Sequence, residues 1–185
     1  MTRIVAGSAG GRRLRVPPAG TRPTSDRVRE ALFSALAARI DFDGLRVLDL
    51  YAGSGALGLE ALSRGAAVAV LVESDRRAAE VVESNIADLG LPGAVLCRAA
   101  VAAVLAGPAE APFGVVFSDP PYVLADDAVT ADLAALVAGG WVEPGSLVAV
   151  ERSSRSAQTR WPAAFDPGKP RKYGETRIDL AIVAE

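Results

Sequence analysis

Apolar runs of strand length alternate with amphipathic segments of helix length from residue 45 onward. The apolar runs occupy residues 45–51, 67–73, 94–97, 113–119 and 146–151. Between them, residues 56–65, 75–90 and 127–140 have the spacing of helices, and all three segments end in glycine. Continuous apolar strands separated by helices predict a parallel sheet buried on both faces. In such sheets, ligands bind beyond the carboxyl ends of the strands.

The two ends of the chain follow other patterns. Residues 3–16 place two short β-prone runs around a glycine-rich centre, which predicts a small hairpin. A proline-rich break leads into residues 24–40, where apolar side chains recur at every fourth position and a Thr-Ser-Asp sequence can cap a helix. Residues 176–183 alternate between polar and apolar side chains, which favours an antiparallel strand near an edge of the sheet. With 185 residues, half of them hydrophobic, the chain has room for one domain with a sizeable core.

Composition narrows the possible chemistry. The chain has no histidine and one cysteine, Cys97, which excludes an internal disulfide, the usual zinc clusters and Ser-His or Cys-His nucleophile pairs. We therefore expect no metal. No run of 18 apolar residues occurs and the N-terminus lacks the apolar core of a secretory signal, so we expect a cytoplasmic protein without a membrane partner.

Charge is distributed unevenly although the net charge is only −2. Residues 1–30 carry a net charge of +5, residues 31–150 a net charge of −9, and residues 151–185 a net charge of +2. An acidic body with basic ends suits an enzyme that contacts nucleic-acid phosphates through its ends, because phosphate binding depends on local Lys and Arg. A disordered basic tail is the alternative interpretation.

The stretch DLYAGSGALG, residues 49–58, contains the spacing GxGxxG directly after an apolar run. Glycines at this place let the backbone approach an adenosine-containing cofactor. Glu73 ends the next apolar run, 20 residues after Gly53, where a carboxylate can accept from ribose hydroxyls in a nicotinamide dinucleotide or in S-adenosyl-L-methionine. Asp49 distinguishes between these two cofactors, because a carboxylate repels the pyrophosphate of a dinucleotide and attracts the ammonium or sulfonium group of S-adenosyl-L-methionine. The pattern favours S-adenosyl-L-methionine; a plain tight turn and a solvated Glu73 are the alternatives.

Asp119-Pro120-Pro121-Tyr122 directly follows the fourth apolar run, at the edge of the sheet where a substrate would meet the cofactor. Methylation of a nucleobase amine needs acceptors facing its N–H bonds, so that the nitrogen lone pair becomes available. The Asp119 carboxylate and the Pro120 carbonyl are such acceptors, the two prolines fix the backbone direction, and the Tyr122 ring can stack on a base. Positioning and electrostatics carry such a step without a strong base. A surface turn is the alternative.

Together with these motifs, the segments RPTSDRVREALF and KYGETRIDL resemble the bacterial RsmD family of 16S rRNA (guanine-N2)-methyltransferases, over essentially the whole chain. The resemblance implies an α/β, Rossmann-like class I S-adenosylmethionine-dependent methyltransferase fold with a seven-stranded, mostly parallel sheet. It implies an N-terminal β-hairpin extension in residues 1–22 that contacts RNA, and a methyltransferase domain in residues 23–185. The implied reaction is methylation of the exocyclic N2 amine of one guanine in 16S rRNA, within the small ribosomal subunit or its assembly intermediate. We expect a monomer.

The resemblance also assigns roles to residues at the motif positions. It places Asp49, Tyr51, Gly53, Ser54 and Gly55 at the methionine end of the cofactor, Glu73 and Ser74 at its ribose, and Asp119, Pro120, Pro121 and Tyr122 at the target base. The predicted RNA-binding residues are Arg12, Arg13, Arg15, Arg22, Thr24, Lys169, Arg171 and Lys172. The chain departs from the family at Ala99 and Ala100, where a polar side chain often lies near the adenine, so backbone groups or Arg98 are left for that contact.

Other functions remain open at this point. A DNA adenine-N6 methyltransferase uses the same motifs but normally needs a target-recognition region, for which the chain has no room. A glutamine methyltransferase of release factors more typically has Asn at position 119. A non-catalytic RNA-binding protein on this fold is a third alternative, and intact Asp119 and Gly53 speak against it.

Overall fold

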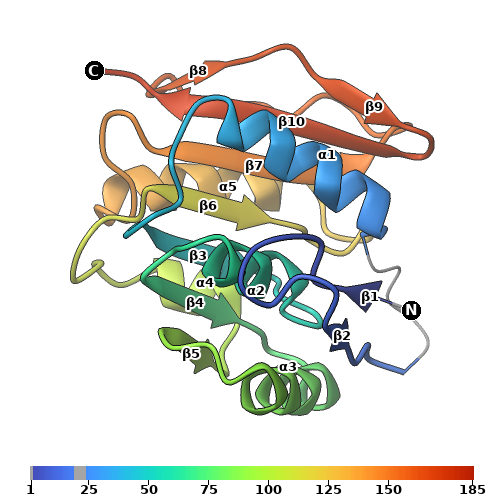
Figure 1. Cartoon of the computed structure of the whole chain (residues 1–185). Helices are drawn as coiled ribbons and strands as arrows, with labels where there is room; N and C mark the ends of the chain where they lie inside the picture. Colours follow the sequence, from blue (N-terminus) through green and yellow to red (C-terminus); the bar gives the residue numbers. More distant parts are fainter. Residues whose placement is uncertain (1, 19–23) are drawn as a thin grey trace.

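A mixed sheet forms the centre of the molecule (Figure 1). The computed structural model describes residues 2–18 and 24–185. The strand order is β5-β4-β3-β6-β7-β10-β8, and β9 also pairs with β10. The strands of this sheet are β3 (Arg46–Leu50), β4 (Val68–Val72), β5 (Ala94–Cys97), β6 (Val115–Ser118), β7 (Leu147–Ser153), β8 (Phe165–Pro167), β9 (Arg171–Tyr173) and β10 (Thr176–Val183).

The five strands β3 to β7 run parallel, as their apolar sequences predict, and β10 is antiparallel to β7. Strands β8 and β9 pair with opposite ends of β10, so together they occupy one position beside it. The sheet therefore has seven strand positions, and the predicted α/β fold with a mostly parallel seven-stranded sheet is confirmed.

Helices cover both faces of the sheet (Figure 1). Helices α1 (Asp26–Ala37), α2 (Ala56–Ser63) and α3 (Arg76–Leu89) pack on one face, and α4 (Val101–Leu105) and α5 (Asp126–Ala138) pack on the other. Local sequence sets the helix ends. The Ser25 hydroxyl accepts a hydrogen bond from Val28 N, the Asp75 carboxylate accepts one from Ala78 N, and Gly90 ends α3 in a left-handed conformation. No helix among the described residues is long and apolar enough to cross a membrane.

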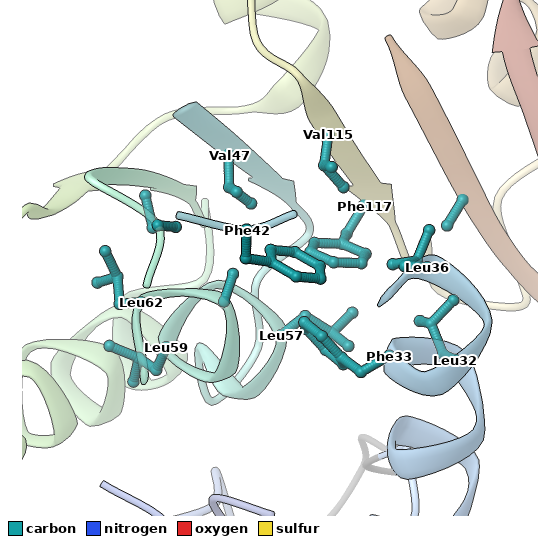
Figure 2. Close-up of a cluster of buried hydrophobic side chains, with 14 of the residues drawn as sticks. Leu32, Phe33, Leu36, Phe42, Val47, Leu57, Leu59, Leu62, Val115 and Phe117 are labelled. Atoms are coloured by element: carbon teal, nitrogen blue, oxygen red, sulfur yellow. The ribbon is translucent and has the colours of Figure 1, made fainter. Parts of the chain in front are cut away.

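An aromatic cluster fixes α1 over the centre of the sheet, as Figure 2 shows. The ring of Phe33 in α1 lies 5.3 Å from that of Phe42 and 5.4 Å from that of Phe117 in β6, measured between ring centroids. Leu57 and Leu59 of α2 join the same cluster. Because Phe33 is fully buried between helix and sheet, the start of α1 is held near the carboxyl ends of β6 and β7.

The N-terminal residues form the predicted hairpin, with β1 (Thr2–Arg3) antiparallel to β2 (Arg13–Leu14). The hairpin is docked on α2. The buried Glu60 carboxylate accepts hydrogen bonds from Val5 N at 2.8 Å and Ala6 N at 3.0 Å, and it pairs with the buried guanidinium of Arg29 at 3.5 Å. Any Cβ at Gly7 would lie 1.9 Å from the carbonyl oxygen of Ser63, so this close approach requires glycine. The described part of this segment is therefore a packed element and not a free tail; the predicted boundary between residues 22 and 23 lies outside the described residues.

Candidate active site

The glycine-rich loop joins β3 to α2 at the carboxyl edge of the sheet. Gly53 and Gly55 both have positive φ, and Gly55 directly precedes α2. A Cβ at Gly55 would lie 2.9 Å from Leu71, whereas a Cβ at Gly53 would meet nothing within 4 Å. Tyr51 is the one described non-glycine residue with positive φ, at 58°. Such conformations cost free energy and persist where the surroundings enforce them, often at binding sites.

Glu73 fastens this loop to the end of β4. Its Oε1 accepts a hydrogen bond from Gly53 N at 2.8 Å, and its Oε2 accepts one from Asp75 N at 2.9 Å. Glu73 is half-buried and the neighbouring Ser74 is exposed. Their predicted contact with a ribose stays a prediction, and the structure adds a role for Glu73 in holding Gly53.

Asp49 is a buried carboxyl group with spare hydrogen-bonding capacity beneath the loop. Its Oδ2 accepts from Gly58 N at 2.9 Å, while its Oδ1 is buried and, among the described residues, has no hydrogen-bond partner. Burial raises the pKa of Asp49 to about 8; the hydrogen bond from Gly58 opposes this shift and the charge of Glu73 adds to it. An orphaned acceptor beside an open glycine loop fits a ligand that brings a cationic donor, as the ammonium of S-adenosyl-L-methionine does.

The Tyr51 hydroxyl points away from the loop to α5. Its Oη lies 2.5 Å from Asp132 Oδ2, and burial followed by this carboxylate raises the pKa of Tyr51. Burial likewise raises the pKa of Asp132. The hydroxyl is thus engaged, so only the ring and backbone of Tyr51 are left for a ligand.

Asp119 directly follows β6, and Glu151 of β7 lies level with it in the parallel register. Thr24, which precedes α1, brings one hydroxyl to both carboxyl groups. Its Oγ1 lies 2.5 Å from Glu151 Oε2 and 3.3 Å from Asp119 Oδ2. A hydroxyl has one proton to donate, so both contacts are hydrogen bonds only when one carboxyl group carries a proton.

The pKa of Asp119 is raised well above its ordinary value. Burial is the largest cause, and the charges of Glu151 and Asp49 raise the pKa further. The hydrogen bond from Thr24 and the charge of Arg152 act in the opposite direction. The site therefore gathers three carboxyl groups on one sheet edge, which favours at least one protonated member at neutral pH.

Residues after Asp119 form a held loop with an exposed tip. Pro120 is buried, whereas Tyr122 is 48% exposed and Val123 is 94% exposed. The buried guanidinium of Arg152 donates from Nη2 to the carbonyl of Leu124 and to Asp126 Oδ1, both at 3.0 Å. Arg152 thus fixes the far end of the loop, and the Tyr122 ring is accessible for stacking on a planar base.

The predicted RNA-binding residues lie in two places. Arg12, Arg13 and Arg15 are exposed on the second half of the hairpin, with Arg12 Nη2 2.6 Å from the Asp88 carbonyl and Arg15 Nε 3.1 Å from Asp88 Oδ2. Lys169, Arg171 and Lys172 are exposed before and along β9. Through β10, Lys172 is level with the carboxyl end of β7. Thr24 lies with the carboxyl groups, and Arg22 lies outside the described residues.

Several contacts at this edge have no local sequence signal. Thr24 to Glu151, Tyr51 to Asp132 and Arg152 to Leu124 each join residues far apart in the chain. Only Glu151 has a signal in the sequence, because it ends the apolar run of residues 146–151 as Glu73 ends the run of residues 67–73. At the position predicted to lie near the adenine, Arg98 is paired with Glu83 at 2.7 Å, and Ala99 and Ala100 offer no polar side chain.

The family model described as "Conserved hypothetical protein 95" matches residues 2–182. Ribosomal RNA small subunit methyltransferase D of Escherichia coli strain K12 is 38% identical over 179 residues, which cover 96% of this chain and 88% of that protein. The putative rRNA methyltransferase YlbH of Bacillus subtilis strain 168 is 44% identical over 124 residues, covering 65% of this chain and 66% of that protein.

Solved structures of methyltransferases have a similar fold. The putative methyltransferase yhhF from Escherichia coli has a TM-score of 0.86 and 36% identity, with 99% of this chain and 98% of that chain covered. Magnesium protoporphyrin IX methyltransferase from Synechocystis PCC 6803, solved with bound SAM, has a TM-score of 0.66 at 12% identity, covers 89% of this chain and 87% of that one, and supports the fold alone. The family match and the 38% identity along nearly the whole chain establish that this protein is a methyltransferase of the RsmD family.

Proposed function

We propose that this enzyme transfers a methyl group from S-adenosyl-L-methionine to the exocyclic N2 amine of a guanine in the 16S rRNA of the small ribosomal subunit. The observation that carries the proposal is the meeting of Asp119 with the glycine-rich loop and Asp49 at one sheet edge. The name of the Escherichia coli relative, which is matched along 88% of its length, supports ribosomal RNA of the small subunit as the substrate.

The residues of the loop fit the cofactor. When bound, S-adenosyl-L-methionine supplies an electrophilic methyl group on a sulfonium. Gly53 leaves open space for the ligand, and Asp49 Oδ1 offers a buried acceptor for a cationic donor. Glu73 holds Gly53 N in place and borders the same space, where its remaining acceptor capacity suits ribose hydroxyls.

On the substrate side, Asp119 and Pro120 directly follow β6 at the edge where the amine must approach, and they offer a carboxylate and a backbone carbonyl as acceptors. Hydrogen bonds from the amine to these oxygens orient the nitrogen and make its lone pair available for attack. As the N–C bond forms and the C–S electron pair stays with sulfur, the nitrogen must release a proton. Asp119 is placed to take this proton, and the Thr24 hydroxyl links Asp119 to Glu151, which spreads the proton over two carboxyl groups.

RNA is held on either side of this edge. The Tyr122 ring stacks on the target base, which has to leave its helix to reach Asp119. Exposed arginines of the hairpin and the basic residues of β9 contact phosphates, which positions the RNA without reading its sequence. In this proposal residues 1–22 are an RNA-contact extension of the methyltransferase domain at 23–185, the enzyme acts as a monomer, and the reaction takes place in the cytoplasm.

The test is methyl transfer from labelled S-adenosyl-L-methionine to small subunits that lack their native base methylations, followed by nucleoside digestion and mass spectrometry. We expect N2-methylguanosine in the digest. Free 16S rRNA and duplex DNA are assayed in parallel. A product confined to DNA, or a methylated nucleoside other than N2-methylguanosine, overturns the proposal.

A further inference from the structure

Asn85 is a buried side chain of α3 that touches two distant parts of the chain. It is 1% exposed. Its Oδ1 accepts a hydrogen bond from Arg15 N at 2.8 Å, and its Nδ2 donates to the Arg15 carbonyl at 3.0 Å and to the Ser54 carbonyl at 2.8 Å. One carboxamide therefore joins the segment that follows β2 of the hairpin to the glycine-rich loop.

The geometry leaves this amide no alternative orientation. Both protons of Nδ2 meet backbone carbonyls and Oδ1 meets a backbone N–H. With the amide reversed, an acceptor would face two carbonyls and a donor would face an N–H. In a buried place each such mismatch is unfavourable, so the hairpin and the loop are held in one relative position.

The contacts that the hairpin makes with α2 do not reach the loop. Ser63 Oγ donates to the Ala6 carbonyl at 2.6 Å and accepts from Ala9 N at 2.9 Å. Glu60 accepts from Val5 N and Ala6 N. These contacts hold the hairpin on α2. Asn85 in addition links the position of the hairpin to that of Ser54, which lies between the two loop glycines.

We propose that Asn85 is a positioning residue that couples occupancy of the cofactor site to docking of the hairpin. A ligand that fixes the loop also fixes the Ser54 carbonyl. This strengthens the hydrogen bonds of Asn85, which in turn hold the backbone at Arg15. Linkage makes the effect reciprocal, so a hairpin held by RNA raises the affinity of the loop for its cofactor. The inference rests on the proposed function for the cofactor loop, but not on the identity of the RNA.

The experiment is native-state hydrogen exchange of the hairpin amides in the full chain, with and without saturating S-adenosylhomocysteine. In the wild type we expect the ligand to slow exchange in residues 2–18 by about 10-fold, within the range typical of coupling between sites. Asn85→Asp keeps the size and the Oδ1 acceptor but loses both donors, and Asn85→Ala removes the whole link. In both variants we expect the ligand to leave hairpin exchange unchanged within about 2-fold.

Ser63→Ala is the matched control, because Ser63 fastens the hairpin and does not touch the loop. Its hairpin should exchange faster overall and still be slowed by the ligand about 10-fold. Equal ligand protection in the wild type and the Asn85 variants overturns the inference, and so does a wild type that binds the ligand in calorimetry without protecting the hairpin. A wild type that binds no S-adenosylhomocysteine contradicts the proposed function together with the inference. Failure of the inference alone is therefore distinguished from failure of the proposed function.

Discussion

At the scale of single residues, burial sets the acidity of the site. The carboxyl ends of three neighbouring strands carry Asp49, Asp119 and Glu151. Burial raises the pKa of both aspartates. The motifs in the sequence revealed the two aspartates because each stands at a fixed offset from glycine or proline. They did not reveal Glu151 as a partner, since its contact with Thr24 depends on how α1 packs across β6 and β7.

Replacing Glu151 by Gln should shift the acid limb of methyl transfer to lower pH. Asp119 accepts N–H bonds best when ionised, and the charge of Glu151 is a cause of its raised pKa. Removing that charge lowers the pKa of Asp119, so activity persists to lower pH. Single-turnover rates measured between pH 5 and pH 9 test this, with Thr24→Ser, which keeps the hydroxyl, as control. An unmoved acid limb, or one moved to higher pH, contradicts it.

Asp49 should make stability depend on pH. Its pKa is about 8 in the folded state against 3.8 ordinarily, so the folded state binds the proton more tightly than the unfolded state. The stabilisation is present in full below about pH 4 and is lost as pH rises towards 8. Asp49→Asn removes this dependence, so urea unfolding should show the variant gaining a few kcal/mol relative to wild type between pH 5 and pH 8. A constant difference in unfolding free energy over this range would count against the buried acid.

Among the helices and strands, those with a long apolar period or with clear signals at their ends could be predicted from the sequence. The parallel strands, β10 and helices α1, α2, α3 and α5 follow from long apolar periods, caps and terminal glycines. The sequence did not predict α4, β8 or β9, which have five, three and three residues and are too short to show a period. Their positions depend on the neighbours against which they pack.

The end of β4 and the glycine loop should behave as one binding element. Glu73→Ala leaves Gly53 N without its acceptor and removes the carboxylate that faces the predicted ribose. We expect the dissociation constant for S-adenosylhomocysteine in calorimetry to rise about 10-fold, equivalent to about 1.4 kcal/mol. Glu80→Ala, at an exposed position of α3 outside the predicted site, should change it much less. An unchanged constant in Glu73→Ala shows that the element does not bind the cofactor.

At the scale of the whole molecule, the fold brings cofactor loop, amine acceptor and basic hairpin to one side. The hairpin could be predicted from the sequence, but its packing on α2 and α3 could not. This packing depends on Glu60, Ser63 and Asn85, which look in the sequence like ordinary helix residues. Charge segregation along the chain and the family resemblance both predict an RNA partner for the N-terminal segment.

Neutralising the hairpin should weaken RNA binding and lower its salt dependence. Arg12→Gln with Arg13→Gln removes two exposed charges, so the slope of log affinity against log salt should fall by about 1.4, at about 0.7 for each single-strand phosphate contact. Filter binding to small subunits at several salt concentrations tests this. Arg39→Gln is the control, because Arg39 lies by the amino end of β7, at the opposite edge of the sheet. A slope that falls equally in the control indicates a general charge effect.

Asp119→Ala distinguishes an action of Asp119 on the amine, as proposed, from an action on the cofactor, because one preparation serves for a binding and a rate measurement. The measurement pairs the dissociation constant for S-adenosyl-L-methionine with the single-turnover rate of methyl transfer to small subunits. We predict a constant within about 2-fold of wild type and a rate lowered by about 1000-fold, the size expected for loss of a group that stabilises the transition state. Equal losses in binding and rate would place Asp119 in the cofactor site and not at the amine.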